Sequence, residues 1–311
     1  MRIAVIGLGD IAQKAYLPLI TTQNDIDLVF CTRNQTTLNH LTRMYRITDS
    51  VSDIDELSGK AVDAAFVHTS TESHTDIVEK LLQRGVHVYL DKPIAYSYEE
   101  SRKLVELSEQ TGRILMIGFN RRFAPMYSQL RTKEKRQLII MQKNREFSPD
   151  NIRHVVFDDF IHVVDTLLYL APGRISNARV SSLQKEGQTY QVVLQLDGDG
   201  FTALGVMNRD SGMNEEVLEV TNPGNKWVVR GLNTTAHYVG GEEHIYHFND
   251  WDSVLHRRGF PQIIGHFLHC VKHNSTPLQS ARNALDTHAL CEQITTEIEQ
   301  DGVTGNTTGQ S

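Results

Sequence analysis

Two patterns of apolar and polar residues divide the chain. In the first part, short apolar runs that suit buried strands alternate with stretches whose apolar residues recur at helical spacing. Strands are expected at Ile3–Ile6, Ile26–Cys31, Val62–His68, Val86–Leu90 and Ile114–Ile117, and helices at Gln35–Tyr45, Ser73–Arg84 and Tyr98–Gln110. This alternation predicts an α/β domain over residues 1–120, with a doubly wound parallel sheet and helices on both faces.

The pattern changes after Arg122. The stretch Asp158–Leu170 has the apolar spacing of a helix, and alternating runs then follow one another without intervening helices. These runs are Tyr190–Leu196, Phe201–Met207, Val217–Thr221, Lys226–Arg230 and His244–Phe248, before two closing helices at Phe260–Lys272 and Ala281–Glu299. We therefore predict a second, α+β domain over residues 121–300 with a mostly antiparallel open sheet. Residues 301–311, rich in Gly, Thr and Asn, are expected to be a disordered tail.

The turn after the first strand carries a candidate nucleotide site. Gly7, Gly9 and Ala12 in the segment GLGDIA follow the strand at dinucleotide-fingerprint spacing. Gly7 permits the tight turn, Gly9 allows the backbone to approach a pyrophosphate, and Ala12 allows close packing of the next helix. The amides of Asp10, Ile11 and Ala12 at the helix start would face the phosphates. The pattern predicts a Rossmann domain; the alternative is a glycine turn that binds nothing.

Other candidate cofactor contacts lie where the parallel strands end. Ligands of doubly wound sheets bind at the carboxyl ends of the strands, so residues from separate strands can share one crevice. The residues expected there are Thr32, Arg33, Asn34, Thr69, Ser70, His74, Asp91, Lys92 and Asn120.

The end of the second strand bears on the choice of coenzyme. NAD-binding domains usually place an acidic residue there to accept hydrogen bonds from the ribose 2′-hydroxyl. This strand instead runs into Thr32, Arg33 and Asn34. Arg33 can pair with a 2′-phosphate, which favours NADP over NAD; the alternative is that Arg33 is a solvated turn residue.

Composition narrows the classes of partner. The net charge of −7 and the pI near 6.0 do not favour a nucleic-acid surface. No apolar run reaches membrane-span length and no apolar leader precedes the first strand, so we expect a soluble protein without membrane association. The three cysteines lack CxxC spacing, which suits the cytoplasm. The 14 histidines do not form a recognisable zinc-site motif with acidic or thiol residues. No metal is expected.

Four motifs together resemble the glucose–fructose oxidoreductase, inositol dehydrogenase and rhizopine catabolism family, written Gfo/Idh/MocA. They are GLGDIA at Gly7–Ala12, YLDKPIA at Tyr89–Ala95, GFNRRF at Gly118–Phe123 and DDFIHVVD at Asp158–Asp165. The resemblance implies a Rossmann domain joined to an α/β domain whose open sheet supports a homo-oligomer, a dimer or tetramer. It also implies NAD(P)-dependent oxidation or reduction of a hydroxyl carbon in a sugar, cyclitol or related polyol.

The resemblance assigns Lys92, Asp158 and His162 as catalytic. We expect these three, together with Arg121 and Asp165, to contact the substrate. Two positions depart from the family pattern. Asp91 stands where glutamate is usual, and Phe160 stands where glycine is common, which is expected to put a ring near the substrate.

The residue types suit this chemistry. The imidazole of His162 can take the hydroxyl proton because it titrates near physiological pH. Asp158 lies four residues earlier, within reach on one helix face, and can orient the imidazole or accept a substrate hydroxyl. The Lys92 ammonium can stabilise developing alkoxide charge.

Each of these residues also has a structural alternative. Asp158 can cap the helix while His162 packs in the core, and Lys92 can be a loop residue. Of Arg121 and Arg122, one is expected to hold a substrate oxygen or an inter-domain carboxylate and the other to be structural. Asp165 is either a substrate or histidine partner or an ordinary helix residue.

The leading hypothesis is hydride transfer between a nicotinamide cofactor and a sugar or polyol. A nicotinamide-binding sensor without turnover is the first alternative, against which the presence of both Lys92 and His162 argues. A glycosidase that oxidises its substrate transiently with tightly held NAD is the second.

Overall fold

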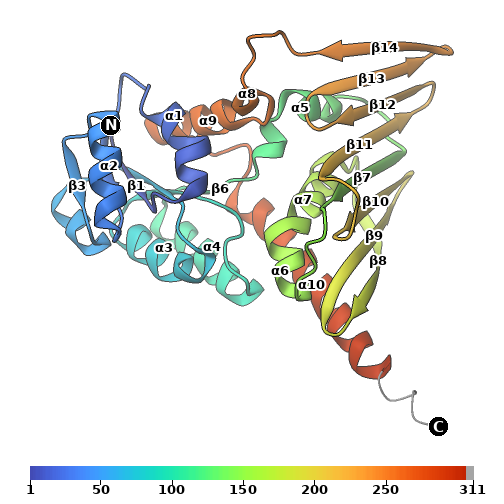
Figure 1. The fold of residues 1–311 in the computed structure, drawn as a ribbon, viewed down its shortest axis with the longest axis horizontal. Coiled ribbons are helices and arrows are strands. Elements are labelled where there is room, and N and C mark those ends of the chain that lie inside the picture. Colours follow the sequence, from blue (N-terminus) through green and yellow to red (C-terminus); the bar gives the residue numbers. More distant parts are fainter. Residues whose placement is uncertain (306–311) are drawn as a thin grey trace. The chain divides into compact units, whose positions relative to one another are not determined.

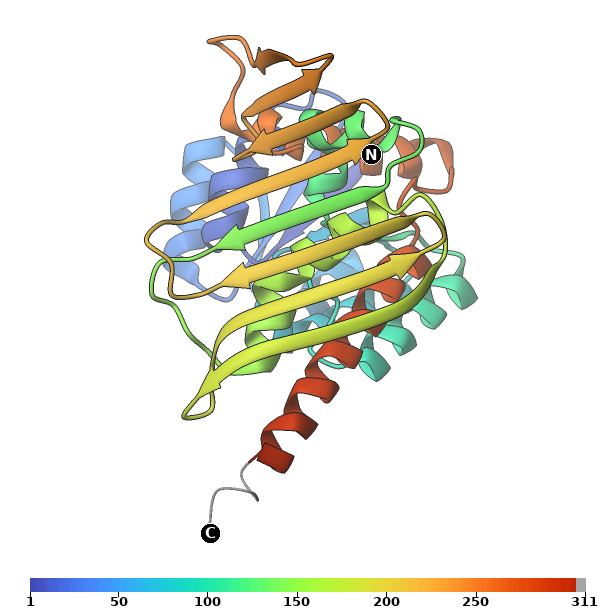
Figure 2. The ribbon, with the colours of Figure 1, turned by 90° about the vertical axis from the view of Figure 1, so that its right-hand side faces the viewer.

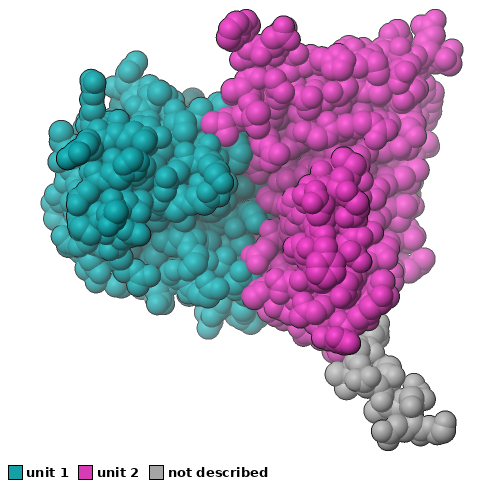
Figure 3. All heavy atoms as spheres, in the orientation of Figure 1, with its two compact units in different colours: residues 1–119, 260–286 teal, residues 120–259, 287–311 magenta. Residues whose placement is uncertain are grey.

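The protein has two compact units in the structure, a computed structural model that describes residues 1–305. Unit 1 contains Met1–Phe119 and Phe260–Asp286, and unit 2 contains Asn120–Gly259 and the chain from Thr287 onward (Figure 3). The sequence pattern assigned residues 260–286 to the second domain, whereas the structure places them in unit 1. Of the expected tail, residues 306–311 lie outside the described residues, and 301–305 continue the last helix.

Unit 1 is built on a parallel sheet of six strands in the order β3-β2-β1-β4-β5-β6 (Figure 1). The strands are β1 (Arg2–Ile6), β2 (Asp27–Cys31), β3 (Asp49–Val51), β4 (Ala64–Val67), β5 (His87–Leu90) and β6 (Leu115–Ile117). Every residue of β4 and β5 is buried, which is why these strands, apart from His87, consist of apolar and aromatic residues. The doubly wound prediction is confirmed; only the short β3 was missed.

The helices of unit 1 cover both faces of this sheet (Figure 1). They are η1 (Ala12–Tyr16), α1 (Leu17–Ile20), α2 (Gln35–Tyr45), η2 (Ile54–Gly59), η3 (Thr71–Ser73), α3 (His74–Gln83), α4 (Tyr98–Thr111) and α9 (Phe260–His273). The first is a π-helical turn. Pro18 has no N–H to donate to the carbonyl four residues earlier, so an interrupted ladder is expected at this point.

Helix α9 joins unit 1 through aromatic packing. The ring of Phe267 lies 5.2 Å from that of Phe66 and 5.6 Å from that of Tyr89, on neighbouring strands. Phe260 lies 5.3 Å from Tyr16 in an edge-to-face arrangement. A helix distant in sequence therefore buries aromatic residues of β4 and β5, and this burial decides its place in unit 1.

Unit 2 is built on an open sheet of eight strands in the order β14-β13-β12-β11-β7-β10-β9-β8 (Figure 2). The strands are β7 (Leu138–Asn144), β8 (Ile175–Lys185), β9 (Gln188–Gly198), β10 (Phe201–Asn208), β11 (Glu215–Asn222), β12 (Asn225–Arg230), β13 (Thr234–Val239) and β14 (Glu242–His247). Only β7 and β10 pair in parallel, which confirms the mostly antiparallel prediction. The edge strand β8 was missed because most of its residues are exposed and show no apolar alternation.

Unit 2 also contains short helical turns before its main helix. Its helical elements are η4 (Asn120–Phe123), α5 (Pro125–Arg131), α6 (Ile152–His154), η5 (Val155–Phe160), α7 (Ile161–Leu170), α8 (Val254–Arg257) and most of α10 (Ala281–Gly305). No helix among the described residues is both long enough and apolar enough to cross a bilayer.

Phe160 is packed in the core of unit 2. Its side chain is fully buried. The space comes from Gly205 on β10, where an added Cβ would lie 2.8 Å from Val163 Cγ1 and 3.4 Å from Phe160 Cζ. The ring thus fills room left by a glycine on the facing strand. This corrects the expectation that it stands near the substrate.

We predict that Gly205→Ala destabilises the protein by about 1–3 kcal/mol, because the new methyl group overpacks the contact between α7 and β10. Urea unfolding would measure the loss. Adding Val163→Ala should recover part of it, and Gly212→Ala is the control because a Cβ there meets nothing within 4 Å. Equal stability of Gly205→Ala and the wild type would contradict this packing.

Candidate functional site

A crevice of about 540 Å³ opens in unit 1 at the carboxyl ends of β1, β2 and β4. Seven residues expected from the sequence line it: Gly7, Gly9, Thr32, Arg33, Asn34, Thr69 and Ser70. The structure thus brings the glycine turn together with the ends of the two neighbouring strands. This is the place where doubly wound sheets bind nucleotides.

The two glycines act in different ways. Gly7 has φ +82°, and a Cβ there would lie 2.7 Å from the His68 carbonyl carbon and from the Thr69 nitrogen. A Cβ on Gly9 would meet nothing within 4 Å, so it would project into open space beside the turn. Gly7 is therefore required for the backbone packing within the fold. At Gly9 the absence of a side chain leaves room for a ligand such as a pyrophosphate.

Buried polar atoms without partners also lie in the wall of this crevice. Thr69 Oγ1 and both ring nitrogens of His68 are buried and make no hydrogen bond to any described residue. Such atoms are uncommon in folded proteins, where buried polar groups are normally satisfied. The turn, the open side and these atoms fit a bound dinucleotide.

Several predicted cofactor residues have structural roles. The Asn34 side chain lines the crevice but also caps α2, accepting a 3.0 Å hydrogen bond from the Thr37 amide. The exposed Asp10 forms an ion pair with Lys14 at 2.7 Å. Ile11 is 38% exposed outside the crevice lining, and Ala12 is buried under the first helix.

The other predicted residues outside the crevice lining stabilise loops. His74 is buried, and its ring bridges two loops through Pro93 O at 2.9 Å and Thr69 O at 3.2 Å. Within unit 2, Asn120 donates from Nδ2 to Arg258 O at 2.8 Å. The contacts of His74 and Asn120 therefore support structural roles.

The crevice also contains residues that the sequence analysis missed. They are Ile6, Leu8, Cys31, Ser52, Asp53, Ile54, His68, Ser73, Asp76, Ile77 and Lys80. The segment Ser52–Ile54 reaches the site because β3 pairs with β2 at the sheet edge. Asp53 and Glu56, three residues apart, form a capping box, and this spacing could have predicted from the sequence that a helix begins there.

Lys92 follows β5 and forms a cis peptide bond with Pro93. The Lys92 amide donates to Asp91 Oδ1 at 3.0 Å. Burial raises the pKa of Asp91, although the charge and the amide of Lys92 act in the opposite direction. Asp91 thus lies beneath the backbone of the proposed catalytic lysine.

In unit 2, Asp158 and His162 lie on consecutive helical elements. Asp158 is half-buried in the π-helical turn η5, and His162, only 9% exposed, is in the first turn of α7. π-helical turns are rare and are frequent at functional sites.

Asp159 in the same turn pairs with the cations of Lys143, Arg145 and Arg209. Burial would raise the pKa of Asp159, but the hydrogen bond from Arg145 and the charge of Lys143 lower it below the usual range. The adjacent carboxylate therefore anchors the turn that carries Asp158.

Both arginines after Asn120 form buried ion pairs within unit 2. Arg121 contacts Glu216 at 2.7 Å, and Arg122 contacts Asp165 at 2.6 Å. Burial opposes ionisation of Glu216, yet the charge and hydrogen bonds of Arg121 lower its pKa to about 2. Asp165 is 1% exposed. These contacts support structural roles for the two arginines and for Asp165.

Among the described residues, no group of three or more His, Cys, Asp or Glu side chains is placed to hold a metal ion. The three cysteines are buried and free.

Comparisons with known proteins agree with this architecture. Residues 1–119 match the model of the oxidoreductase family with an NAD-binding Rossmann fold, Gfo/Idh/MocA, and residues 125–238 match the YceM-like C-terminal domain. YceM of Salmonella typhimurium is 33% identical over 94% of this chain and 97% of its own length. The chain belongs to the Gfo/Idh/MocA oxidoreductase family.

Two further comparisons extend this result. The crystal structure of the dehydrogenase MviM from Clostridium difficile is 34% identical, with a TM-score of 0.90, covering 96% of this chain and 99% of that one. The scyllo-inositol 2-dehydrogenase (NAD(+)) of Bacillus subtilis is 25% identical, covering 89% of this chain and 88% of its own. The protein is therefore an oxidoreductase related over most of its length to dehydrogenases.

We predict that His68 makes the unliganded protein sensitive to acid. Burial lowers its pKa from 6.5 to about 3, so between these values the unfolded chain binds a proton that the folded chain does not. Stability should fall by about 2 kcal/mol from this residue between about pH 7.5 and pH 5.

Urea unfolding at both pH values would measure the effect. The loss should be smaller in His68→Phe and unchanged in the control His40→Gln, which alters an exposed histidine. An acid loss of wild-type size in His68→Phe would exclude His68 as its source.

Proposed function

We propose that the protein is a dehydrogenase or reductase that prefers NADP and acts on a hydroxyl or carbonyl carbon of a sugar, cyclitol or related polyol. The observation that carries the proposal is the crevice in unit 1, where the glycine turn, the end of β2 and the end of β4 meet. Its unpartnered polar atoms and its bare backbone at Gly9 support a dinucleotide ligand.

The preference for NADP rests on Arg33 in the crevice lining. The segment Cys31–Asn34 at the end of β2 carries this guanidinium and no carboxylate, although Lys80, Asp53 and Asp76 also line the crevice. A guanidinium suits a 2′-phosphate because it forms paired, charge-assisted hydrogen bonds. When bound, the nicotinamide ring supplies the hydride acceptor or donor.

The proton chemistry is assigned to side chains of the matched motifs. In the oxidation direction, His162 takes the hydroxyl proton of the substrate at an imidazole nitrogen. Asp158 orients the imidazole or holds a neighbouring hydroxyl, and the Lys92 ammonium stabilises negative charge on the reacting oxygen. Arg121 and Asp165 are engaged in buried ion pairs, and substrate contact is assigned to Lys92, Asp158 and His162 on the strength of the matched motifs.

A polyol or sugar substrate is supported by relatives. The Bacillus subtilis relative is named for action on scyllo-inositol, whose ring carries only secondary alcohols. The buried Phe160 ring leaves this assignment unaffected because it packs against β10.

We also propose that the protein forms a homo-oligomer, a dimer or tetramer, through the sheet of unit 2. Figure 2 shows one face of this sheet without a covering helix in the described chain. Extended sheet surfaces of this kind are usually buried in assemblies or kept strongly polar.

Coenzyme titration tests the assignment of Arg33. Arg33→Ala should weaken NADPH binding by about tenfold to a hundredfold, the loss of a charge-assisted contact, and should change NADH binding by less than about threefold. Protein fluorescence would give both dissociation constants. Arg43→Ala, an exposed arginine on α2, is the matched control. Equal weakening of both coenzymes would refute the 2′-phosphate contact.

Turnover tests the two proton-handling residues. After a panel of inositols, polyols and aldoses has identified a substrate, Lys92→Ala and His162→Ala should each lower kcat by at least about a hundredfold. Coenzyme affinity should stay within about threefold, and Lys103→Ala, an exposed lysine on α4, should have wild-type rates. Full turnover in either variant would remove that residue from the reaction. Coenzyme binding without turnover on any substrate would favour a sensor.

A further inference from the structure

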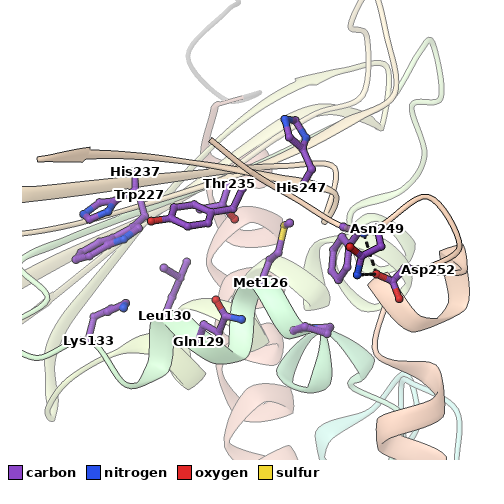
Figure 4. A pocket seen from close by; sticks show the side chains of 13 residues that line it. Met126, Gln129, Leu130, Lys133, Trp227, Thr235, His237, His247, Asn249 and Asp252 are labelled. Carbon is purple, nitrogen blue, oxygen red and sulfur yellow. Dashed lines mark hydrogen bonds between the residues drawn. The ribbon is translucent and has the colours of Figure 1, made fainter. Parts of the chain in front are cut away.

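A second pocket lies within unit 2, between helix α5 and the strands β12 to β14 (Figure 4). Its volume is about 500 Å³. Met126 and Leu130 of α5 form one wall, and Trp227 of β12 and Tyr246 of β14 contribute aromatic surface to the other. The pocket is thus largely apolar and large enough for a ring system.

The same pocket has a basic end. Lys133 and His237 lie at this end beside Trp227, whereas His247 lies toward Asn249 on the other side (Figure 4), and the Lys133 ammonium is 5.3 Å from the centre of the Trp227 ring. Asp252 is the acidic residue in the lining, and its carboxylate accepts hydrogen bonds from the Asn249 amide at 2.9 Å and from Asn249 Nδ2 at 3.3 Å. The lining therefore favours an aromatic group accompanied by negative charge.

An exposed indole with a neighbouring carboxylate lies beside the pocket. Trp251 lies in the Asn249–Asp252 turn, between two residues of the pocket rim, and is 97% exposed. Full exposure of an indole is unusual because Trp is mostly buried in folded proteins. Its neighbour Asp250 is also exposed, so the turn presents an indole and a carboxylate together.

We propose that this pocket receives Trp251 from a second copy of the chain, and that the exchange is reciprocal. The indole packs against Leu130 and Trp227, and the Asp250 carboxylate faces the end that carries Lys133. Trp251 does not occupy the pocket of its own chain, as its exposure shows. A second copy is the occupant because aromatic surface and charge are complementary between this turn and the pocket.

The position of the turn suits a two-fold contact. Donor and acceptor lie on one rim, so a two-fold rotation satisfies both exchanges at once. Two indoles bury only a few hundred Å², less than the roughly 1,200 Å² of a stable interface. Tyr246 and Val254 supply further exposed apolar surface beside the turn, at 53% and 59% exposure.

This inference specifies one contact of the proposed homo-oligomer and does not depend on redox activity. The other proposed surface, the uncovered face of the sheet, involves different residues. The two can therefore be distinguished by experiment.

The chain contains two tryptophans, so one substitution isolates the reporter. In Trp227→Phe, Trp251 is the sole indole. Its emission should move to shorter wavelength as the concentration rises and copies associate, because the ring leaves water. Sedimentation velocity on the same samples would report association.

Pocket variants complete the test. Leu130→Arg in the Trp227→Phe background should return the emission to that of an exposed indole and weaken association at least tenfold. Trp251→Ser in the wild-type chain should weaken association by a similar factor. Circular dichroism and coenzyme binding would show that each variant is folded. Met44→Ser, an exposed apolar residue on α2 of unit 1, is the control and should change nothing because it lies outside both proposed surfaces.

Two results would overturn the inference. One is association in which the Trp251 emission stays that of an exposed indole, which would leave an oligomer formed through the uncovered sheet face. The other is a monomer at all concentrations.

Discussion

The close approach of two backbone segments at Gly7 is the constraint on which the cofactor crevice depends. A Cβ at this position would lie 2.7 Å from backbone atoms of His68 and Thr69, and φ is +82°. β1 and β4 are parallel neighbours and finish at one edge of the sheet, and the missing side chain of Gly7 lets the turn after β1 lie directly against the end of β4. The glycine turn, Arg33 and Thr69 therefore line the same crevice.

Unit 2 positions its candidate catalytic helix by another means, the pairing of buried charges. Asp159 is held by three cations, and Asp165 by Arg122 and by the Thr287 hydroxyl at 3.1 Å. Breaking a buried pair leaves an uncompensated charge, which is strongly destabilising, so these contacts hold the helix firmly to the sheet and to α10. Asp158 and His162 lie one helical turn apart in this segment, so the same ion pairs fix their positions within unit 2.

The centre and the β14 edge of the sheet in unit 2 therefore have different surroundings. The central strands β7 and β10 pack against α7, with Gly205 making room for Phe160. At the β14 edge, every residue of the strand is exposed, and the apolar pocket beside it is bordered by a fully exposed indole. The first region is packed within one chain, whereas the second leaves aromatic and aliphatic side chains exposed to solvent.

Local chemistry in the sequence determined the elements, their alternation and the motifs. Apolar runs such as Ile3–Ile6 and the glycine turn predicted a parallel sheet with a nucleotide site, because strand burial and turn geometry depend on residues a few positions apart. The motifs around Lys92 and His162 likewise indicated the family, because each motif consists of residues that are neighbours in the chain.

Only the tertiary structure decided which distant residues share a surface. Helix α9 belongs to unit 1 because Phe267 meets Phe66 and Tyr89, and Lys80 lines the same crevice as Arg33. Arg121 pairs with Glu216, a partner that no local pattern identifies. The physical reason is that burial and ion pairing depend on two elements that meet in the folded chain. The periodicity of apolar residues, in contrast, shows only which face of a single element is apolar.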